Sequence, residues 1–371
     1  MTERKARRTG ALPALTGVRF LAAFYVLVFH FGFSFATRHH APRLICNFLG
    51  HGYIGVSIFF VLSGFILTYT YALKMTDARG RTLFWEARFA RIYPVYLLAL
   101  LMALPWYAST EATWGYSLAV LTGIQAWFPS NWHIPMAWNT PAWTLSVEAF
   151  FYLLFPFMIG RLQSSSSRKV GGVLGACFLY AIFFHSTELH PDPGWGEPIT
   201  GMIPTPLMRL PEFVTGMCLG IFFLRSTRSG YRGWQMGLAC ASLFVFFLPI
   251  GPWVSISVVP ISIILYQLAF DEGLLAAILS TRLMLLLGGA SYAIYMLQEP
   301  IRQLVRLVFQ HLDPNSSMDA TVSPLVLIGF SILVFRYFEE PLRRRLRDMF
   351  ARRTRIDSAA PLKAAGSRPN P

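Results

Sequence analysis

Two ionisable side chains, Arg19 and His30, interrupt an apolar run that extends from about Leu12 to Ala36. The run is long enough to cross a bilayer. On one helix their separation corresponds to roughly 16 Å of rise and about 20° of rotation, so both lie on one stripe. Because an arginine at membrane depth needs a partner or a wet cavity, this spacing favours a polar track through the membrane. The alternative is that Arg19 snorkels at a helix end while His30 bonds to a neighbouring helix.

Three more charged residues could serve such a track. Arg88 and Arg91 are spaced i, i+3 and share a helix face. Their planar guanidinium forks suit phosphate recognition, although interfacial anchoring explains most such arginines. Glu148 lies inside an apolar stretch, where a functional or paired role is the default. As a catalytic residue it would orient or charge His30, or bind the acceptor. Glu148 could also be a structural partner for a buried arginine.

These residue types point to acyl transfer from a phosphate-bearing donor. Histidine is the natural general base for a hydroxyl, which assigns that role to His30. Arginines at the other end of the track suggest a donor such as a coenzyme A thioester. The chain carries no Walker A motif, no G-x-S-x-G and no metal-ligand cluster. We therefore expect no metal and no permanently bound cofactor, with acyl-CoA as a co-substrate.

Two candidate substrate-binding residues, Trp143 and Ser146, precede Glu148 closely. An indole can stack on a sugar, although interfacial tryptophan belts explain most such residues. On a regular helix Ser146 lies about 200° from Glu148, so both face one cavity only if the helix start is unwound. Thr144 and Tyr152 share the face of Glu148.

The elements that must position these residues are membrane helices. Of 371 residues, 54% are hydrophobic and only 13% are charged, and the mean hydropathy is +0.48. Soluble domains carry about twice that charged fraction. The net charge of +14 could suggest a nucleic-acid partner, but the basic residues alternate along loops and tails. That distribution is typical of a membrane protein and excludes nucleic acid as the expected partner.

The apolar pattern predicts an all-α polytopic membrane protein with about ten spans. Residues 107–140 are aromatic and broken by prolines, so we expect a re-entrant or interfacial segment after the third span. A kink is expected at Pro94. The predicted spans are approximately 12–36, 53–73, 89–106, 140–159, 170–186, 208–224, 233–249, 252–270, 283–309 and 323–339.

The basic residues also predict the orientation. With both termini cytoplasmic, inside segments hold 25 of the 32 lysines and arginines, and outside loops hold two. Such a bias predicts a multi-pass protein of the inner membrane with both termini in the cytoplasm. Three regions follow, namely a basic cytoplasmic tail at 1–11, a single transmembrane domain at 12–342 and a basic, disordered cytoplasmic tail at 343–371.

Two motifs favour structural roles. In Phe59-Phe60-Val61-Leu62-Ser63-Gly64-Phe65 the small residues let helices approach closely, so packing is expected. Arg336 and Glu340 are spaced i, i+4 and are expected to pair.

The chain resembles the membrane acyltransferase family 3, whose members O-acylate sugars on lipopolysaccharide, exopolysaccharide, Nod factors and some macrolides. The resemblance covers nearly the whole chain and rests on five motifs in order at fitting spacing. They are R-x10-H at Arg19 and His30, F-F-x-L-S-G-F at 59–65, R-x-x-R at Arg88 and Arg91, W-S-L-S-x-E-x-x-F-Y at 143–152 with Thr144 for the first Ser, and S-Y-x-x-Y at 291–295 followed by R-Y-x-E-x-P at 336–341.

The resemblance implies ten spans, a re-entrant loop after the third, and acyl-CoA as donor. It also implies that His30 and Arg19 are essential. Relatives often have a His where this chain has Gln298, which could alter the choice of acceptor. We therefore expect an integral-membrane O-acyltransferase that moves an acyl group, with acetyl the first expectation, to a hydroxyl of a carbohydrate or glycosylated acceptor. The alternative is a glycan transporter or flippase without acyl chemistry.

Overall fold

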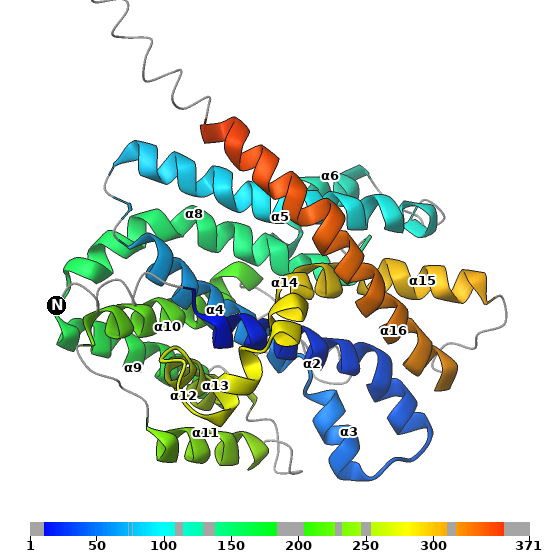
Figure 1. Ribbon diagram of the computed structural model, residues 1–371, viewed down its shortest axis with the longest axis horizontal. Coiled ribbons are helices and arrows are strands. Elements are labelled where there is room, and N and C mark those ends of the chain that lie inside the picture. Colours follow the sequence, from blue (N-terminus) through cyan, green and yellow to red (C-terminus); the bar gives the residue numbers. More distant parts are fainter. Residues whose placement is uncertain are drawn as a thin grey trace, which may run out of the picture.

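The computed structural model describes residues 11–72, 74–75, 77–107, 114–128, 138–183, 204–226, 232–245, 254–309 and 317–351. Within these ranges the chain is helical and contains no strand, which confirms the all-α class (Figure 1). The α-helices are α2 Pro13–Arg38, α3 Arg43–Gly50, α4 Ile54–Tyr71, α5 Ala78–Tyr107, α6 Trp114–Thr122, α8 Trp143–Ser164, α9 Ser167–Phe183, α10 Thr205–Arg225, α11 Gly233–Val245, α12 Val258–Leu268, α13 Leu274–Leu279, α14 Arg282–Met296, α15 Gln298–Val308 and α16 Ser317–Val334. Short 3₁₀ turns are η1 Gln125–Trp127, η2 Thr140–Ala142 and η5 Val254–Ser257, and η6 Phe335–Glu339 is a π-helical turn.

Six helical stretches of the described chain are long and apolar enough to cross a membrane. They are Pro13–Arg38, Arg43–Tyr71, Ala78–Tyr107, Thr140–Ser164, Thr205–Arg225 and Asp319–Ala351. Val258–Leu268 and Arg282–Met296 are shorter apolar helices. The membrane class is confirmed, while the count of ten spans and the re-entrant segment stay predictions. Residues 129–137, at the centre of that segment, and most of both predicted tails lie outside the described residues.

Two expected boundaries were wrong. The segment before 89 is not a loop, because α5 already begins at Ala78. The ninth expected span is two helices that meet at Leu297. The reason is Pro300, which has no N–H for the Met296 carbonyl and whose ring clashes with a continuing helix.

Helices α4 and α10 cross closely through glycines. A Cβ on Gly64 would run into the Phe213 carbonyl, and a Cβ on Gly216 would run into the Val61 carbonyl. Small residues at such positions let two backbones touch, which is how helices associate without a hydrophobic drive in lipid. The expectation that the motif at 59–65 serves packing therefore holds for Gly64.

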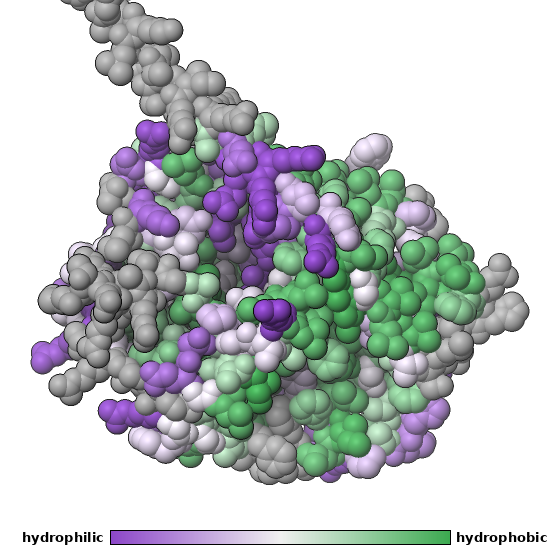
Figure 2. Space-filling model, viewed as in Figure 1, coloured by the Kyte–Doolittle hydropathy of each residue, from purple (hydrophilic) through white to green (hydrophobic). Residues whose placement is uncertain are grey.

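The core behind this crossing is filled mainly by phenylalanine. Phe60 contacts Phe151 edge-on, and Phe151 stacks on Phe213 with ring centroids 4.7 Å apart. Apolar side chains also remain exposed around the bundle, as a lipid-facing surface requires. Figure 2 shows hydrophilic residues gathered where α5 and the helical segment 340–351, beyond η6, lie, with apolar residues covering the right-hand part of the same face. This face is therefore divided into a polar and an apolar part.

Candidate active site

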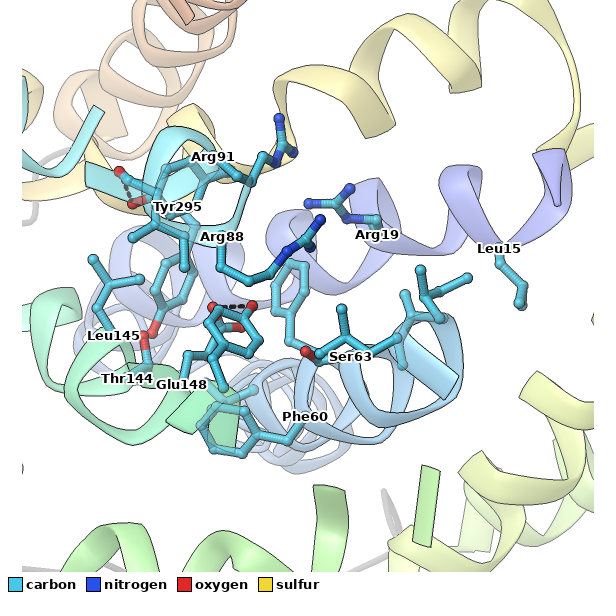
Figure 3. Close-up of a pocket in the computed structure, with 18 of the residues that line it drawn as sticks. Leu15, Arg19, Phe60, Ser63, Arg88, Arg91, Thr144, Leu145, Glu148 and Tyr295 are labelled. Carbon is cyan, nitrogen blue, oxygen red and sulfur yellow. Dashed lines mark hydrogen bonds between the residues drawn. The ribbon is translucent and has the colours of Figure 1, made fainter. Parts of the chain in front are cut away.

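A cavity of about 180 Å³ lies between α2, α4, α5, α8 and α14. Figure 3 shows its walls, with side chains from five helices converging on one space. Its lining residues are Leu15, Thr16, Arg19, Val56, Phe59, Phe60, Leu62, Ser63, Ile66, Leu67, Arg88, Arg91, Ile92, Thr144, Leu145, Glu148, Tyr152, Tyr292 and Tyr295. Four of the seven residues predicted for the site are among them.

Three guanidinium groups gather at one side of the cavity (Figure 3). Arg88 donates a hydrogen bond from Nη2 to the Tyr71 hydroxyl at 3.1 Å and lies 5.4 Å from the centre of that ring. Arg91 forms an ion pair with Glu339. Within the described chain Arg19 makes neither a hydrogen bond nor an ion pair. The cavity therefore holds a cation that no described side chain neutralises by direct contact.

Glu339 reaches Arg91 because of the π-helical turn η6. Its side chain is 1% exposed and that of Arg91 is 13% exposed, so the pair is buried. A π turn inserts a residue into the helix and changes which side chains face inward. The expected pairing of Arg336 with Glu340 was wrong for the same reason. Arg336 is exposed, and Glu340 instead pairs with the two arginines that follow it, Arg343 and Arg344.

Glu148 lies in the cavity wall opposite the arginines and is held by Tyr152, whose hydroxyl donates to Oε2 at 3.0 Å. Tyr152 is fixed in turn through its backbone. Pro156 cannot donate to the Tyr152 carbonyl, and the Trp85 indole N–H does so instead at 2.9 Å. The carboxylate is thus positioned by α5 as well as α8, and it does not contact His30.

His30 lies on α2 but does not line the cavity. Val56, at the start of α4, lines the cavity. The adjacent Gly55 packs on Ala22 and Val26 of α2. His30 is one helical turn past Val26, a rise of about 6 Å. Its ring meets the Phe29 ring edge-on at 5.0 Å and forms no hydrogen bond within the described chain. The imidazole nitrogens are therefore not engaged by any described side chain.

Trp143 and Ser146 do not line the cavity either. Trp143 packs edge-on against Phe60 at 6.5 Å. Ser146 is buried and accepts a hydrogen bond from the Ala126 backbone N–H at 3.3 Å. Its hydroxyl ties α8 to the η1 turn on the side away from Glu148, as helical geometry requires.

Sequence reasoning missed the cavity roles of Ser63, Tyr292 and Tyr295. Tyr292 and Tyr295 are spaced i, i+3 on α14, and the Tyr292 hydroxyl donates to the Ile92 carbonyl at 2.8 Å. The repeated tyrosine in S-Y-x-x-Y was the available signal, because a shared helix face follows from that spacing. The resulting wall combines guanidinium groups, one carboxylate and several hydroxyls. Such a set can bind an anionic group at one end and hydroxyl-bearing molecules along its length.

Comparison with known proteins agrees with this geometry. The chain is 29% identical over 312 residues to the acyltransferase MdmB of Streptomyces mycarofaciens, and the match covers 78% of each chain. It is 23% identical over 363 residues to the peptidoglycan O-acetyltransferase OatA of Listeria monocytogenes, covering 90% of this chain and 56% of the relative. A third relative, the O-acetyltransferase OatA of Staphylococcus aureus, is 25% identical over 164 residues, which are 40% of this chain and 24% of the relative.

No solved structure matches the chain. The family profile described as "Acyltransferase domain" matches residues 12–336, which is most of the sequence. The protein therefore belongs to the membrane acyltransferase family 3 that its motifs resemble.

Proposed function

We propose that the protein is an integral-membrane O-acyltransferase that moves an acetyl group from cytoplasmic acetyl-CoA to a hydroxyl of a carbohydrate or glycosylated acceptor. The observation that carries the proposal is the unpaired guanidinium of Arg19 beside Arg88 and Arg91 in a cavity between membrane helices. Isolated cations are costly at such depth, and a ligand with phosphates would compensate that cost. The names of the relatives, which include O-acetyltransferases of peptidoglycan, favour acetyl as the group and a carbohydrate as its acceptor.

The donor would bind with its phosphates on the arginines. A planar guanidinium can bind two phosphate oxygens at once. Arg88 and Arg91 line the same cavity as Arg19. The pantetheine arm of coenzyme A is a narrow chain that ends in the thioester. The cavity continues past Glu148 and the tyrosines toward Val56, which provides a path of suitable polarity.

Transfer would then proceed near the end of that path. His30 takes the proton of the acceptor hydroxyl as the oxygen attacks the thioester carbonyl. The tetrahedral intermediate collapses and the carbon–sulfur bond breaks. The His30 imidazolium then returns its proton to the coenzyme A thiolate, which leaves as the thiol. Because His30 lies about one turn beyond the cavity, the acceptor must reach it from the C-terminal end of α2. Glu148 would orient the donor or the acceptor through the hydroxyl network that it forms with Tyr152.

The proposal assigns the arginine end of the cavity to the cytoplasm. Arg88 and Arg91 follow the basic segment that opens α5, and positive residues favour the cytoplasmic side. His30 then lies in the outer half of an inner-membrane protein, where a periplasmic or extracellular acceptor could enter. Donor and acceptor would thus arrive from opposite sides.

The deciding experiment uses purified protein in lipid nanodiscs with labelled acetyl-CoA and candidate glycans. The expected result is an increase in acceptor mass by one acetyl group and release of free coenzyme A. A transporter would leave the mass of every glycan unchanged, and that outcome across the panel would overturn the proposal.

His30 is the proposed general base. His30→Ala should lower the transfer rate by about 10²- to 10⁴-fold because the acceptor hydroxyl loses that base. Acetyl-CoA binding and the unfolding temperature should stay unchanged, since the ring makes no hydrogen bond to the described chain. His39→Ala, in the turn that ends α2, is the matched control and should keep full activity. A His30 variant with near-normal turnover would remove this assignment.

A further inference from the structure

Two buried carboxamides, Asn139 and Gln298, are both anchored on backbone carbonyls at the end of α14. Asn139 is 0% exposed and Gln298 is 2% exposed. Asn139 donates from Nδ2 to the Met296 carbonyl at 3.0 Å, and Gln298 donates from Nε2 to the Tyr295 carbonyl at 2.8 Å. Because only the NH₂ end of a carboxamide can donate to a carbonyl, these bonds fix which atom of each group is oxygen.

Both carboxamide oxygens are left without a hydrogen-bond partner in the described chain. A buried acceptor without a partner is rare in proteins and is compensated by a ligand or a water molecule. Here two such oxygens belong to side chains anchored on consecutive carbonyls of the same turn. Two unpaired oxygens at one helix end are harder to explain as a packing defect than a single one would be.

The Met296 carbonyl has no backbone hydrogen bond because Pro300 occupies the position of its helical donor. A proline nitrogen cannot donate, and the Asn139 side chain supplies the missing bond at the junction between α14 and α15. Asn139 therefore stabilises the helix break with its nitrogen. That structural task leaves its oxygen unused.

The backbone before Asn139 is strained to hold it there. Trp138 has φ of 68°, a left-handed conformation that a bulky residue rarely adopts. Its ring stacks on Tyr107 with centroids 4.5 Å apart, and its indole N–H donates to the Leu100 carbonyl at 2.8 Å. Residues kept in such conformations by their surroundings cluster at functional sites. The strain is independent evidence that the position of Asn139 matters.

The pair is linked both to the cavity wall and to His30, although neither carboxamide lines the cavity. Tyr295, whose carbonyl binds Gln298, lines the cavity, as does Thr144 shortly after Asn139. One turn farther along α15, Arg302 donates to the backbone carbonyl of His30 at 3.3 Å. Gln298 thus binds a residue of the cavity wall and lies one helical turn before the residue that contacts the proposed base.

We propose that the carboxamide oxygens of Asn139 and Gln298 form a subsite that accepts hydrogen bonds from hydroxyl groups of the acceptor. The ligand class is a polyhydroxylated, uncharged portion of a glycan, because the subsite offers fixed neutral acceptors and no charge of its own. The inference rests on the proposed function, which it deepens by assigning the acceptor. Holding a neighbouring hydroxyl there would present the reacting one to His30.

The test compares Gln298→Met with Gln298→His in the full chain in nanodiscs. Methionine keeps the length but offers no comparable acceptor, whereas histidine can donate at one ring nitrogen and accept at the other. Gln303→Met is the matched control on the same helix, because the Gln303 amide donates to Glu299 and lies outside the pair. The probes are the methyl glycosides of glucose, galactose and N-acetylglucosamine, followed by ligand-observed NMR and by acetyl transfer.

Gln298→Met should weaken glycoside binding and raise the acceptor KM about threefold to tenfold, as loss of one hydrogen bond predicts. The KM for acetyl-CoA should not change, and Gln303→Met should behave like the wild type. Gln298→His, which keeps one ring nitrogen as an acceptor, should lose less glycoside affinity than Gln298→Met. Equal glycoside binding by wild type and Gln298→Met would show that water alone fills the subsite and would overturn the inference. So would an absence of binding of every glycoside to the wild type. Glycoside binding that depends on Gln298 without any acetyl transfer would instead refute the proposed function and keep the subsite.

Discussion

At the scale of single residues, the cavity contains two kinds of arginine. Arg91 is neutralised by Glu339 inside the bundle, whereas Arg19 has no direct partner in the described chain. Breaking a buried ion pair leaves one charge without compensation, but replacing an unpaired charge removes a cost. Substitutions at the two positions should therefore have opposite structural consequences. The effect on stability therefore distinguishes Arg19, proposed to bind only a ligand, from Arg91, which also stabilises the fold.

Arg19→Gln should weaken acetyl-CoA binding about tenfold to a hundredfold, which corresponds to the loss of one charge-assisted hydrogen bond. The unfolding temperature should stay constant or rise, because no hydrogen bond or ion pair of the described chain is lost and a buried charge is removed. Isothermal titration of the donor and thermal unfolding in the same detergent measure the two effects. Arg282→Gln, an exposed arginine at the start of α14, should change neither. A large loss of stability without weaker donor binding would contradict the role given to Arg19.

Arg91→Gln should lower the free energy of unfolding by about 3 to 5 kcal/mol, because it leaves the Glu339 carboxylate buried and unpaired. The double variant Arg91→Gln, Glu339→Gln should recover most of that loss, since neither charge remains. Denaturant unfolding of the two variants in mild detergent gives the comparison. Additive losses in the double variant would mean that the two side chains do not stabilise each other.

At the scale of elements, backbone contact and proline breaks position the site. The glycines of α4 and α10 bring these helices together, and α4 supplies Ser63 and the two phenylalanines of the cavity wall. Pro156 and Pro300 each free a carbonyl, and a side chain from another part of the chain, Trp85 or Asn139, binds it. Each break thus ties two distant segments together. The site depends on these ties more than on any single helix.

Gly64→Ala should destabilise the protein by about 1 to 3 kcal/mol, because the added methyl group meets the Phe213 carbonyl and forces α4 and α10 apart. Gly172→Ala is the control on α9, where a Cβ meets nothing within 4 Å. There the substitution should be neutral or stabilise by up to about 1 kcal/mol through helix propensity. Thermal unfolding followed by tryptophan fluorescence compares the two, and equal effects would count against the close crossing.

At the scale of the whole molecule, the proposed reaction requires opposite access for its two substrates. The cationic end of the cavity collects residues near the start of α2 and α5, and His30 lies toward the end of α2. Cytoplasmic acetyl-CoA can reach the arginines only if the protein is oriented with that end of the cavity toward the cytoplasm. The loop charges favour that orientation.

Reporter fusions should find both termini in the cytoplasm and the turn after α2 outside. Green fluorescent protein fused after residue 371 should fluoresce, and alkaline phosphatase inserted after Ala41 should be active. Phosphatase inserted after Ser166, between α8 and α9, should be inactive and serves as the matched internal control. An active enzyme at that position would reverse the topology on which the donor assignment depends.

Much of this protein was accessible from its sequence because the relevant signals are local. Apolar runs of bilayer length predicted a helical membrane protein, and the motifs around Arg19, Arg88, Arg91 and Glu148 predicted a shared polar site. The structure indeed places these four residues on one cavity. Spacing along one helix was also sufficient to turn Ser146 away from Glu148.

Other features depend on contacts between residues far apart in the chain, which helical periodicity cannot reveal. Arg91 and Glu339 are separated by 248 positions, and their contact depends on one π turn that rotates the end of α16. The break at Leu297 becomes favourable only because Asn139, 157 positions earlier than Met296, binds the carbonyl that Pro300 leaves free. Local residue patterns determined which segments are helices and which carry charge. Tertiary packing decided which of those charges meet, because a pair such as Arg91 and Glu339 joins helices that are far apart in the sequence.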